Sequence, residues 1–500
     1  MFTQIILLMV FTGIGFATAG YHPGAEDDGI YLTAIQSDLN PSLYPHDSQF
    51  FRLQLQATVF DKYIAGFVRL TGIPVPWTEL LWQFVSILVI VIACWRIASK
   101  LFEEEAARWG GVAMVAAMLS LPVAGTALYL ADFNLHPRNV ASALILLAVW
   151  RILARRRWQA VPLLLAAFLF HPIMGAMGVS FCFFLTIVLW EPAPAWLRAL
   201  NRSLNRSWKG RIGGMGGLAA LAPLGWIFAP PSAPWHKALD TRTYYYLYEW
   251  TWYEWLGAIA PLVLFWLLWR FARKRGQALL ARFALAALLY GVFQQVVAFV
   301  MLTPPGFIRL TPLQPMRYLQ LIYYFMALIG GALIGKHLLK GKAWRWAIYL
   351  AVANGAMLSA QVSLFADCPH LELPGMKTSN PWLQTFAWVR GHTPDNAYFA
   401  LDPYYMDAKD EDNFSFRALA ERSELADAVK DAAVVTQVPE LAPEWNREVD
   451  AASGWEHFKL ADFERLKREF GVDWVLVAYP PPEGLDCRWH DAKLSVCQVP

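Results

Sequence analysis

YHPGAEDDGIY, residues 21–31, follows directly on the first apolar run of the chain. Three consecutive carboxylates, Glu26, Asp27 and Asp28, stand where an apolar helix is expected to leave a bilayer. Glycines on both sides of these acids let the backbone turn. The rest of the chain has the pattern of a membrane scaffold that holds this acidic loop.

The composition is typical of a membrane protein with many spans. Of the 500 residues, 57% are hydrophobic and only 16% are charged, whereas about 25% are charged in an ordinary soluble protein. The 24 Trp and 19 Tyr fit the enrichment of these rings at both bilayer interfaces. A net charge of +3 is too small to indicate a nucleic-acid partner. The sequence therefore predicts a polytopic α-helical membrane protein.

Apolar runs long enough to cross about 30 Å of hydrocarbon, at roughly 1.5 Å per residue, predict about 11 transmembrane helices. Their expected positions are 3–20, 77–97, 110–130, 139–154, 160–174, 176–190, 213–229, 253–270, 280–303, 318–336 and 345–365. The first run also resembles a signal peptide that ends at Ala17-Thr18-Ala19. No Lys or Arg precedes it, which favours a retained helix.

The Lys and Arg residues predict the orientation. One set of alternate connections is rich in them and is therefore expected to be cytoplasmic. These residues are Arg96, Lys100, Arg108, Arg151, Arg155, Arg156, Arg157, Arg198, Arg202, Arg206, Lys209, Arg211, Arg270, Arg273, Lys274, Arg275, Lys336, Lys340, Lys342 and Arg345. The other set includes the acidic loop, so the carboxylates are expected to face outward. An odd number of spans then places the C-terminal end outside as well.

Two domains are expected. Residues 1–366 form the transmembrane domain, which includes a long outer loop over 21–76. Apolar residues recur in that loop at helical spacing, which predicts a helix lying on the membrane surface. These residues are Leu53, Phe60, Ile64 and Phe67. Charged residues and turn signals begin at Asp367, so residues 367–500 are expected to form an extracytoplasmic α/β domain of about 130 residues.

The C-terminal domain is expected to mix helices with strands. Helices are predicted over 381–390, 441–452 and 462–470, and strands over 398–401 and 474–479. Cys487 and Cys497 flank a stretch that can fold as a hairpin. An oxidising compartment favours a disulfide between them, with Cys368 as a competing partner and two free thiols as the alternative. None of the five cysteines has a metal-type spacing.

Asp27 and Asp28 are the strongest candidates for chemistry, with Glu26 as a further one. A carboxylate next to the bilayer can deprotonate an acceptor hydroxyl or hold a metal ion against a phosphate. The alternative is structural, in which these acids cap the loop or the next helix. Adjacent side chains point in different directions, so Asp27 and Asp28 cannot have the same function.

A second charged cluster is expected at the same depth, in LADFNLHPRN over residues 130–139. It places Asp132, His136 and Arg138 at the outer end of the third and fourth spans. Ionisable groups at membrane depth face a bundle interior or a watery cavity, because exposure to lipid costs about 3 kcal/mol or more. The alternative is that these charges only keep a short loop soluble.

Three further residues lie in the outer connections. His171, at an outer turn, is either a helix cap or a ligand. Arg317 opens the tenth expected span, and Arg309 lies in the loop before it. An interfacial Arg either reaches the lipid headgroups or holds a lipid phosphate in its guanidinium fork. The aromatic run over 244–255 is typical of an interfacial belt, with sugar stacking or a lipid-tail groove as the alternative.

These features together resemble the GT-C superfamily. Its members are integral-membrane glycosyltransferases that take sugars from polyprenyl-phosphate carriers, and they include protein mannosyltransferases, aminoarabinose transferases and oligosaccharyltransferases. The resemblance rests on the two outward acidic loops, the approximate number of spans and the outer C-terminal domain. That domain, with FRALAERS over 416–423, is similar to the one in uncharacterised bacterial members. It has no WWD-type motif of the kind that binds an acceptor sequon.

The resemblance implies roles for the charged residues. The first-loop acid of the family falls on Asp27 or Asp28 and acts as general base. The second-loop acid falls on Asp132, which orients the acceptor or a metal. The residues for the carrier phosphate are Arg317, His136 and Arg138. Some members use a divalent cation, Mg or Mn, which Asp28 and Asp132 would hold here, and others use none.

The resulting hypothesis is an inverting glycosyltransferase, integral to the bacterial inner membrane and part of the cell-envelope machinery. It would move a sugar from a polyprenyl-phosphate donor to an acceptor on the outer face, which is a glycan, a lipid or a protein. The alternatives are a lipid or polysaccharide transporter and a catalytically silent scaffold of GT-C-like architecture. A transporter should carry ionisable or broken-helix sites near the bilayer midplane. The acids here gather at one face, which favours the enzyme.

Overall fold

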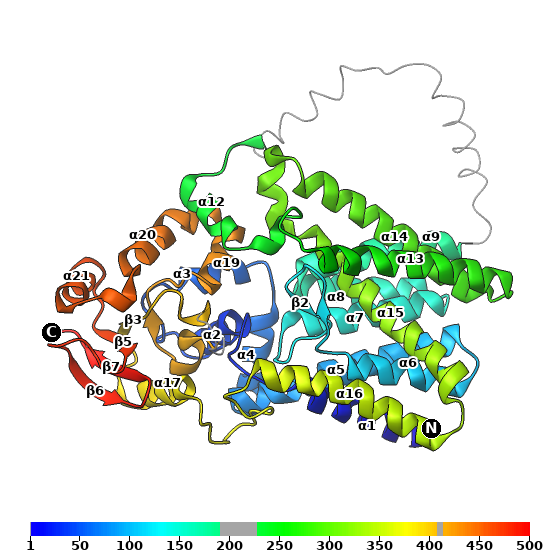
Figure 1. The fold of residues 1–500 in the computed structure, drawn as a ribbon, viewed down its shortest axis with the longest axis horizontal. Helices are drawn as coiled ribbons and strands as arrows, with labels where there is room; N and C mark the ends of the chain where they lie inside the picture. Colours follow the sequence, from blue (N-terminus) through cyan, green and yellow to red (C-terminus); the bar gives the residue numbers. More distant parts are fainter. Residues whose placement is uncertain (1, 191–227, 408–413) are drawn as a thin grey trace, which may run out of the picture.

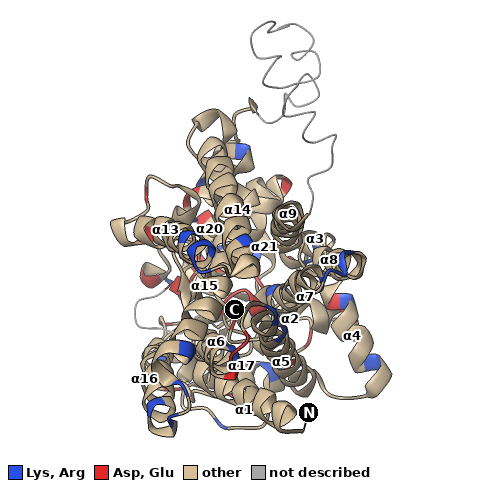
Figure 2. Cartoon of the chain, turned by 90° about the vertical axis from the view of Figure 1, so that its right-hand side faces the viewer, with Lys and Arg blue, Asp and Glu red and all other residues tan. Residues whose placement is uncertain are grey.

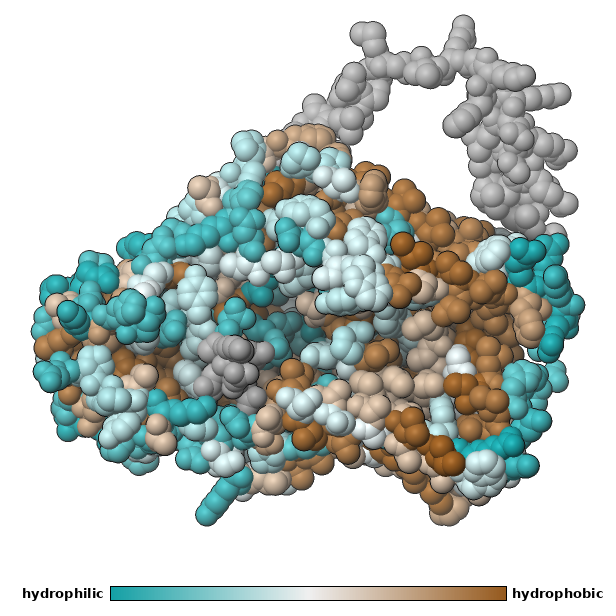
Figure 3. Space-filling view, in the orientation of Figure 1, coloured by the Kyte–Doolittle hydropathy of each residue, from teal (hydrophilic) through white to brown (hydrophobic). Residues whose placement is uncertain are grey.

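The computed structural model describes residues 2–190, 228–407 and 414–500. Figure 1 shows a bundle of long helices on one side and the C-terminal elements on the other. In Figure 3 the surface of the bundle carries a broad hydrophobic region, with hydrophilic side chains at its far end and over the C-terminal part. This distribution is that of a membrane-embedded bundle with a polar part outside the bilayer.

Ten helices of the bundle correspond to expected spans. They are α1 (Phe2–Ala19), α5 (Val75–Leu101), α6 (Glu105–Ala117), α7 (Pro137–Leu153), α8 (Ala160–Phe170), α9 (Pro172–Leu189), α13 (Trp252–Lys274), α14 (Ala278–Leu302), α15 (Leu319–Ile334) and α16 (Ala343–Leu364). Within the described residues, 7 helical segments are long and apolar enough to cross a membrane, and α6, α7 and α8 are shorter. The expected span at 213–229 lies outside the described residues except for its last two, and so do the basic residues expected over 198–211.

The third expected span, 110–130, is too long. Helix α6 ends at Ala117, and the chain then forms an antiparallel hairpin of β1 (Pro122–Val123) and β2 (Leu128–Tyr129). Pro122 has no amide hydrogen to continue a helical hydrogen-bond ladder. The apolar composition after Ala117 therefore belongs to a hairpin that packs at the end of the bundle.

The outer loop contains three helices instead of one surface helix. They are α2 (Asp28–Leu39), α3 (Gln49–Leu55) and α4 (Phe60–Thr71). The Thr58 hydroxyl separates α3 from α4, because it donates to the Phe170 carbonyl at 2.8 Å and accepts from the Phe60 amide at 3.2 Å. In α4, Phe60 and Ile64 are buried and Leu70 is exposed. The helix is amphipathic as predicted, but it starts later.

The C-terminal part has the α/β character that the sequence predicts. Its helices are α17 (Pro381–His392), α18 (Phe416–Ala420), α19 (Lys430–Gln437), α20 (Ala442–Ala452) and α21 (Leu460–Phe470). Its strands are β3 (Tyr398–Ala400), β4 (Ser423–Glu424), β5 (Trp474–Ala478), β6 (Asp486–His490) and β7 (Leu494–Gln498). The sheet order is β4-β3-β5-β7-β6, with parallel pairing from β4 to β5 and antiparallel pairing from β5 to β6.

The outer loop and the C-terminal part share one hydrophobic core. Phe50 of α3, Trp235 of α12 (Ala233–Asp240) and Trp445 of α20 are buried in the same cluster. The Trp235 indole donates to the carbonyl of Val435 in α19 at 3.1 Å. The C-terminal part is thus anchored to the outer loop, and it closes over the acidic stretch.

The bundle end that faces the viewer in Figure 2 has Lys and Arg residues, coloured blue, on α8, α13 and α16. We expect this end to be cytoplasmic. A reporter that is active only outside the cytoplasm should therefore be active when fused after Asp367 and silent when fused after Arg157. The reverse pattern would place the acidic loop in the cytoplasm and contradict the orientation.

Cys487 of β6 and Cys497 of β7 form a disulfide in the structure. The bond closes a loop with a sequence separation of 10, so replacing both cysteines by Ser should lower the unfolding free energy of the sheet by about 2–3 kcal/mol. Proteolysis of the full chain in increasing urea should then cut this region at a lower urea concentration. An unchanged midpoint, or free thiols at both positions in mass mapping of the unreduced wild type, would contradict this expectation.

Candidate active site

Two cavities meet at the end of the bundle where α1 finishes and α7 begins. Their volumes are about 700 and 310 Å³. Both are lined by Asp27, Arg138, Arg242, Tyr244 and Arg317. These five residues form a shared wall, so a molecule in either cavity would face the same carboxylate and the same guanidinium groups.

Backbone contacts fix the acidic loop at this wall. Gly24 has φ +77°, which is a left-handed conformation, and a side chain at Gly29 would meet Ser415 of the C-terminal part at 2.5 Å. The Asn134 amide group donates to the Ala25 carbonyl at 2.9 Å. The acidic loop is therefore held between the loop over residues 130–139 and the C-terminal part.

His136 caps the N-terminus of α7. Its Nδ1 accepts a hydrogen bond from the Arg138 amide at 3.0 Å, so the neutral ring carries its proton on Nε2. That Nε2 lies 3.7 Å from Oδ2 of Asp27. Burial and the neighbouring Arg138 lower the pKa of His136, although Asp132 and Asp27 oppose them. The ring is therefore neutral at physiological pH and presents an N–H group to Asp27.

Arg138 joins the two acidic loops. Its Nε and Nη2 donate to the two oxygens of Asp132 at 3.2 and 2.8 Å, and its Nη1 donates to Asp27 at 3.2 Å. Burial raises the pKa of Asp132, but the charge of Arg138 and its hydrogen bonds outweigh this effect and hold the pKa below its usual value. Asp132 is thus ionised, and its main contact is Arg138.

Asp27 lies among positive and hydrogen-bonding groups. Lys430 of α19 approaches Asp27 at 3.4 Å and binds Glu26 at 2.6 Å. Burial raises the pKa of Asp27, but Lys430, His136 and Arg138 together hold it well below its usual value. The side chain of Asp27 is still 33% exposed, so the carboxylate is ionised and reachable from the cavity.

Asp28 lies away from the shared wall. Its Oδ2 accepts a hydrogen bond from the Gly24 amide at 2.7 Å, and its Oδ1 is buried without a hydrogen-bond partner. Burial raises the pKa of Asp28 to about 7. The hydrogen bond from the Gly24 amide opposes this shift, and the nearby carboxylates of Asp132 and Asp27 add to it. This geometry matches the structural alternative, in which the residue braces the acidic loop.

The raised pKa of Asp28 should give the protein a pH-dependent stability. The folded protein holds the proton of Asp28 more tightly than the unfolded chain does, because the pKa of an unfolded Asp is about 3.9. The contribution of Asp28 to the free energy of unfolding therefore falls as the pH rises from about 4 to about 7. Asp28→Asn should remove a slope of at most about 1.4 kcal/mol per pH unit in that window. Thermal unfolding at several pH values would measure it. Equal slopes in variant and wild type would contradict the assignment.

The three remaining basic candidates, Arg317, His171 and Arg309, lie in different places relative to the cavities. Arg317 is buried, and its guanidinium makes no hydrogen bond or ion pair with the part of the chain that the structure describes. His171 lines the smaller cavity and caps α9, because its Nδ1 accepts from the Met174 amide at 3.4 Å. Arg309 lines neither cavity and instead donates to the Ala229 carbonyl at 2.8 Å. The structure therefore does not bring Arg309 to the shared wall.

Two residues at the site were not expected from the sequence. Arg242 follows α12, and its Nε and Nη2 are buried without partners among the described residues. Lys430 is positioned by Arg417, which lies in the FRALAERS stretch and holds the neighbouring Asp431 through two hydrogen bonds of 2.9 and 3.0 Å. No motif or residue spacing in the sequence marks Arg242 or Lys430 as part of a site.

Asp28 and Asp132 do not fit the divalent-cation site that is expected of them. Divalent Mg and Mn need carboxylate oxygens that are free to coordinate them. Both oxygens of Asp132 accept from Arg138, and one oxygen of Asp28 accepts from the Gly24 amide. Three described carboxylates that do have ligand atoms close together are Asp47, Glu444 and Glu448, and they line neither cavity. No chemical step is therefore assigned to a metal here.

No protein-family model and no curated protein matches the chain. Among solved structures, it is similar to the oligosaccharyltransferase of Archaeoglobus fulgidus in complex with Zn and sulfate, with 12% identity and a TM-score of 0.46 over 94% of this chain and 68% of that chain. The apo form gives 16% identity and 0.23 over 90% and 51%. Oligosaccharyltransferase AglB of the same archaeon, in complex with an inhibitory peptide and a dolichol-phosphate, gives 14% and 0.21 over 95% and 57%. At these values the likeness does not bear on function.

Proposed function

We propose that the protein is a membrane glycosyltransferase that moves a sugar from a polyprenyl-phosphate donor to an acceptor on the outer face of the membrane. One observation supports this function above the others. The ionised carboxylate of Asp27 shares a wall between two cavities with Arg317 and Arg242, whose guanidinium groups have unpartnered N–H groups. A proton acceptor beside an anion-binding surface is what sugar transfer from a phosphate requires.

The proposed reaction is a single displacement. The acceptor hydroxyl oxygen attacks C1 of the sugar and passes its proton to a carboxylate oxygen of Asp27. The bond between C1 and the phosphate oxygen breaks, and its electron pair stays on the phosphate. The products are the glycosylated acceptor, with inverted configuration at C1, and polyprenyl phosphate.

The groups around Asp27 have separate roles. Arg138 and Lys430 keep the carboxylate ionised, so it can accept a proton throughout the physiological pH range. Its low pKa makes it a weak base, and the proton should therefore move late, when cleavage of the C1–O bond has already begun. Asp132 positions Arg138 through two hydrogen bonds. Arg317 and Arg242 neutralise the leaving phosphate through charge-assisted hydrogen bonds.

The experiment that tests this function supplies membranes containing the protein with a labelled pool of polyprenyl-phosphate sugars. Label should leave the donor and appear in an acceptor fraction, at a rate above that of membranes without the protein. A labelled donor pool that stays intact with every sugar offered would contradict the enzyme, and the transporter hypothesis would replace it. Transport would instead move intact donor between the two leaflets.

A further inference from the structure

A basic cavity lies at the bundle end opposite to the candidate site, where α7 and α9 finish and α14 begins. Its volume is about 420 Å³. Within the described residues, three arginines line it, Arg155, Arg157 and Arg282. Aliphatic side chains of all three helices line it too, namely Ile152, Leu153, Leu189, Ala278 and Leu279. Positive charge and hydrocarbon thus share one cavity.

The lining of the basic cavity changes from apolar to charged toward the end of the bundle. Ile152 and Leu153 are the last two residues of α7, and Arg155 and Arg157 follow beyond the helix. Trp190, directly after α9, lines the cavity and is 45% exposed, as is typical of a ring at a bilayer interface. The aliphatic part of the cavity therefore lies within the expected hydrocarbon, and Arg155 and Arg157 lie at the level of the lipid headgroups.

Arg155 and Arg157 keep their hydrogen-bond donors available. Both are exposed, and their side chains form no hydrogen bond or ion pair with the part of the chain that the structure describes. The guanidinium carbon of Arg157 lies 4.9 Å from the centre of the Trp190 ring. A guanidinium group that rests on an aromatic face still has N–H groups that can donate to a phosphate. The two arginines can therefore bind an anion without giving up another partner in the described chain.

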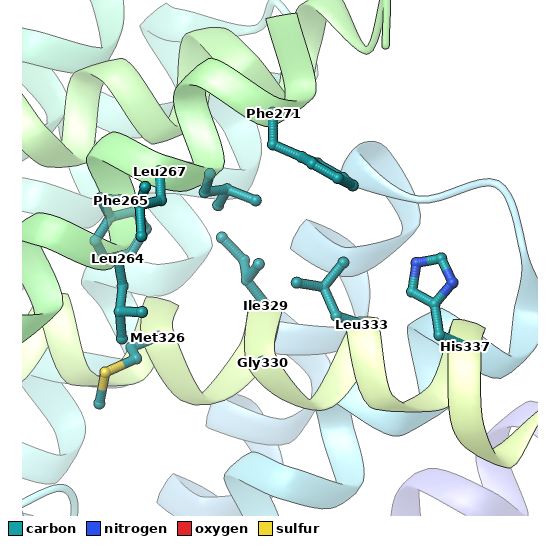
Figure 4. A pocket seen from close by; sticks show the side chains of 10 residues that line it. Leu264, Phe265, Leu267, Phe271, Met326, Ile329, Gly330, Leu333 and His337 are labelled. Carbon is teal, nitrogen blue, oxygen red and sulfur yellow. The ribbon is translucent and has the colours of Figure 1, made fainter. Parts of the chain in front are cut away.

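A groove between α13 and α15 shows what the arginines add. Its volume is about 390 Å³, and Figure 4 shows that apolar side chains, Gly330 and His337 line it. No Lys or Arg among the described residues lines this groove. It can accommodate hydrocarbon, but it offers no fixed positive charge to a phosphate. The basic cavity offers both.

We propose that the basic cavity binds one anionic phospholipid from the leaflet at this end of the bundle. The phosphate contacts Arg155 and Arg157, because guanidinium groups bind phosphate oxygens through paired N–H donors. The first part of an acyl chain lies against the aliphatic side chains of α7, α9 and α14. Basic pockets between membrane helices on the cytoplasmic side are known to bind anionic headgroups. The lipid ties the three helices together, and this inference is independent of the proposed function.

The lining of the cavity favours this lipid over other ligands. A soluble phosphate has no apolar part to contact Ile152, Leu153 and Leu189. A zwitterionic phospholipid brings a positive group of its own toward the two guanidinium groups, and like charges repel. Arginines that only extend to the headgroups of surrounding lipids need no cavity beside them.

Paired arginine substitutions test the cavity. Arg155→Gln combined with Arg157→Gln removes both charges and keeps polar side chains at the two positions. Arg273→Gln combined with Arg275→Gln is the matched control, because these two arginines lie at the end of α13, are exposed and do not line the cavity. Each double variant removes two positive charges from the same end of the bundle.

Native mass spectrometry of the purified protein would compare the binding of phosphatidylglycerol and phosphatidylcholine with the same acyl chains. The wild type should prefer phosphatidylglycerol. Loss of Arg155 and Arg157 should reduce this preference about ten- to thirtyfold, the effect expected of two basic residues beside an anionic headgroup. The control variant should keep the wild-type preference. Inorganic phosphate at the same concentration should not displace phosphatidylglycerol.

Four results would overturn the lipid site. They are equal binding of the two lipids by the wild type, an unchanged preference without Arg155 and Arg157, an equal loss of preference in the control variant, and displacement of the lipid by inorganic phosphate. A further measurement needs only the wild type, in case the variant does not fold. Phosphatidylglycerol should raise the midpoint of thermal unfolding more than phosphatidylcholine does, and equal midpoints would contradict the site.

Discussion

Asp27→Asn is expected to abolish sugar transfer while the protein still folds. The substitution keeps the shape of the side chain and removes the proton-accepting charge, and loss of a general base lowers rates typically by about 10²–10⁴-fold. Asparagine can still accept a hydrogen bond from Arg138, and the Asp27 side chain is partly exposed, so little stability should be lost. Transfer would be measured in vesicles at matched protein levels.

The neighbouring residue supplies the control for this experiment. Asp28 lies outside both cavities, and its pKa is raised to about 7, so a neutral side chain at this position should be tolerated. Asp28→Asn should therefore keep most of the transfer activity. If Asp28→Asn were inactive and Asp27→Asn active, the general base would be the other carboxylate, and the assignment made from the cavity wall would be wrong.

Arg317→Gln should lower kcat/KM by about 10²–10³-fold, the loss typical of removing one donor to a developing negative charge. The Arg317 guanidinium has no partner within the described residues, so its removal leaves no buried carboxylate unpaired and the fold should persist. Arg317→Lys should recover only part of the loss, because an ammonium cannot grip a phosphate in a fork. Initial rates over a range of donor concentrations would measure both variants.

Variants of two other arginines serve as comparisons for Arg317→Gln. Arg309→Gln should keep full activity, because Arg309 lies outside the cavities and binds backbone carbonyls. Arg138→Gln should destabilise the protein by about 3–5 kcal/mol, because it leaves Asp132 buried without its cationic partner. Equal activity of Arg317→Gln and wild type would remove Arg317 from the phosphate site.

The bundle and the two acidic loops could be predicted from the sequence. Apolar length marks a span, and charges such as Asp27, Asp132 and Arg317 at the ends of apolar runs need a polar cavity. The hairpin after Ala117 was missed because apolar composition alone does not distinguish a short buried hairpin from a continuing helix. The three-helix form of the outer loop depends on a hydrogen bond between Thr58 and Phe170, which no local sequence pattern predicts.

The part of the site that could not be predicted depends on long-range contacts. Lys430 reaches Glu26 from 404 positions away in the chain, and its placement depends on the buried pair of Arg417 and Asp431. Which of two adjacent acids faces the cavity depends on the turn before them, where Glu26 has φ +52°. A sequence pattern can locate such an acidic pair, but it cannot orient the two side chains.

The most direct test of the proposed glycosyltransferase measures the conversion of polyprenyl-phosphate sugar to polyprenyl phosphate. The purified protein would be placed in vesicles together with a membrane extract, which supplies the acceptor. Mass spectrometry of the lipid fraction would follow the reaction for wild type, Asp27→Asn and Asp28→Asn. We predict that polyprenyl phosphate accumulates with wild type and Asp28→Asn and stays at background with Asp27→Asn. Equal accumulation with all three proteins, or none with the wild type for any donor sugar, would contradict the function.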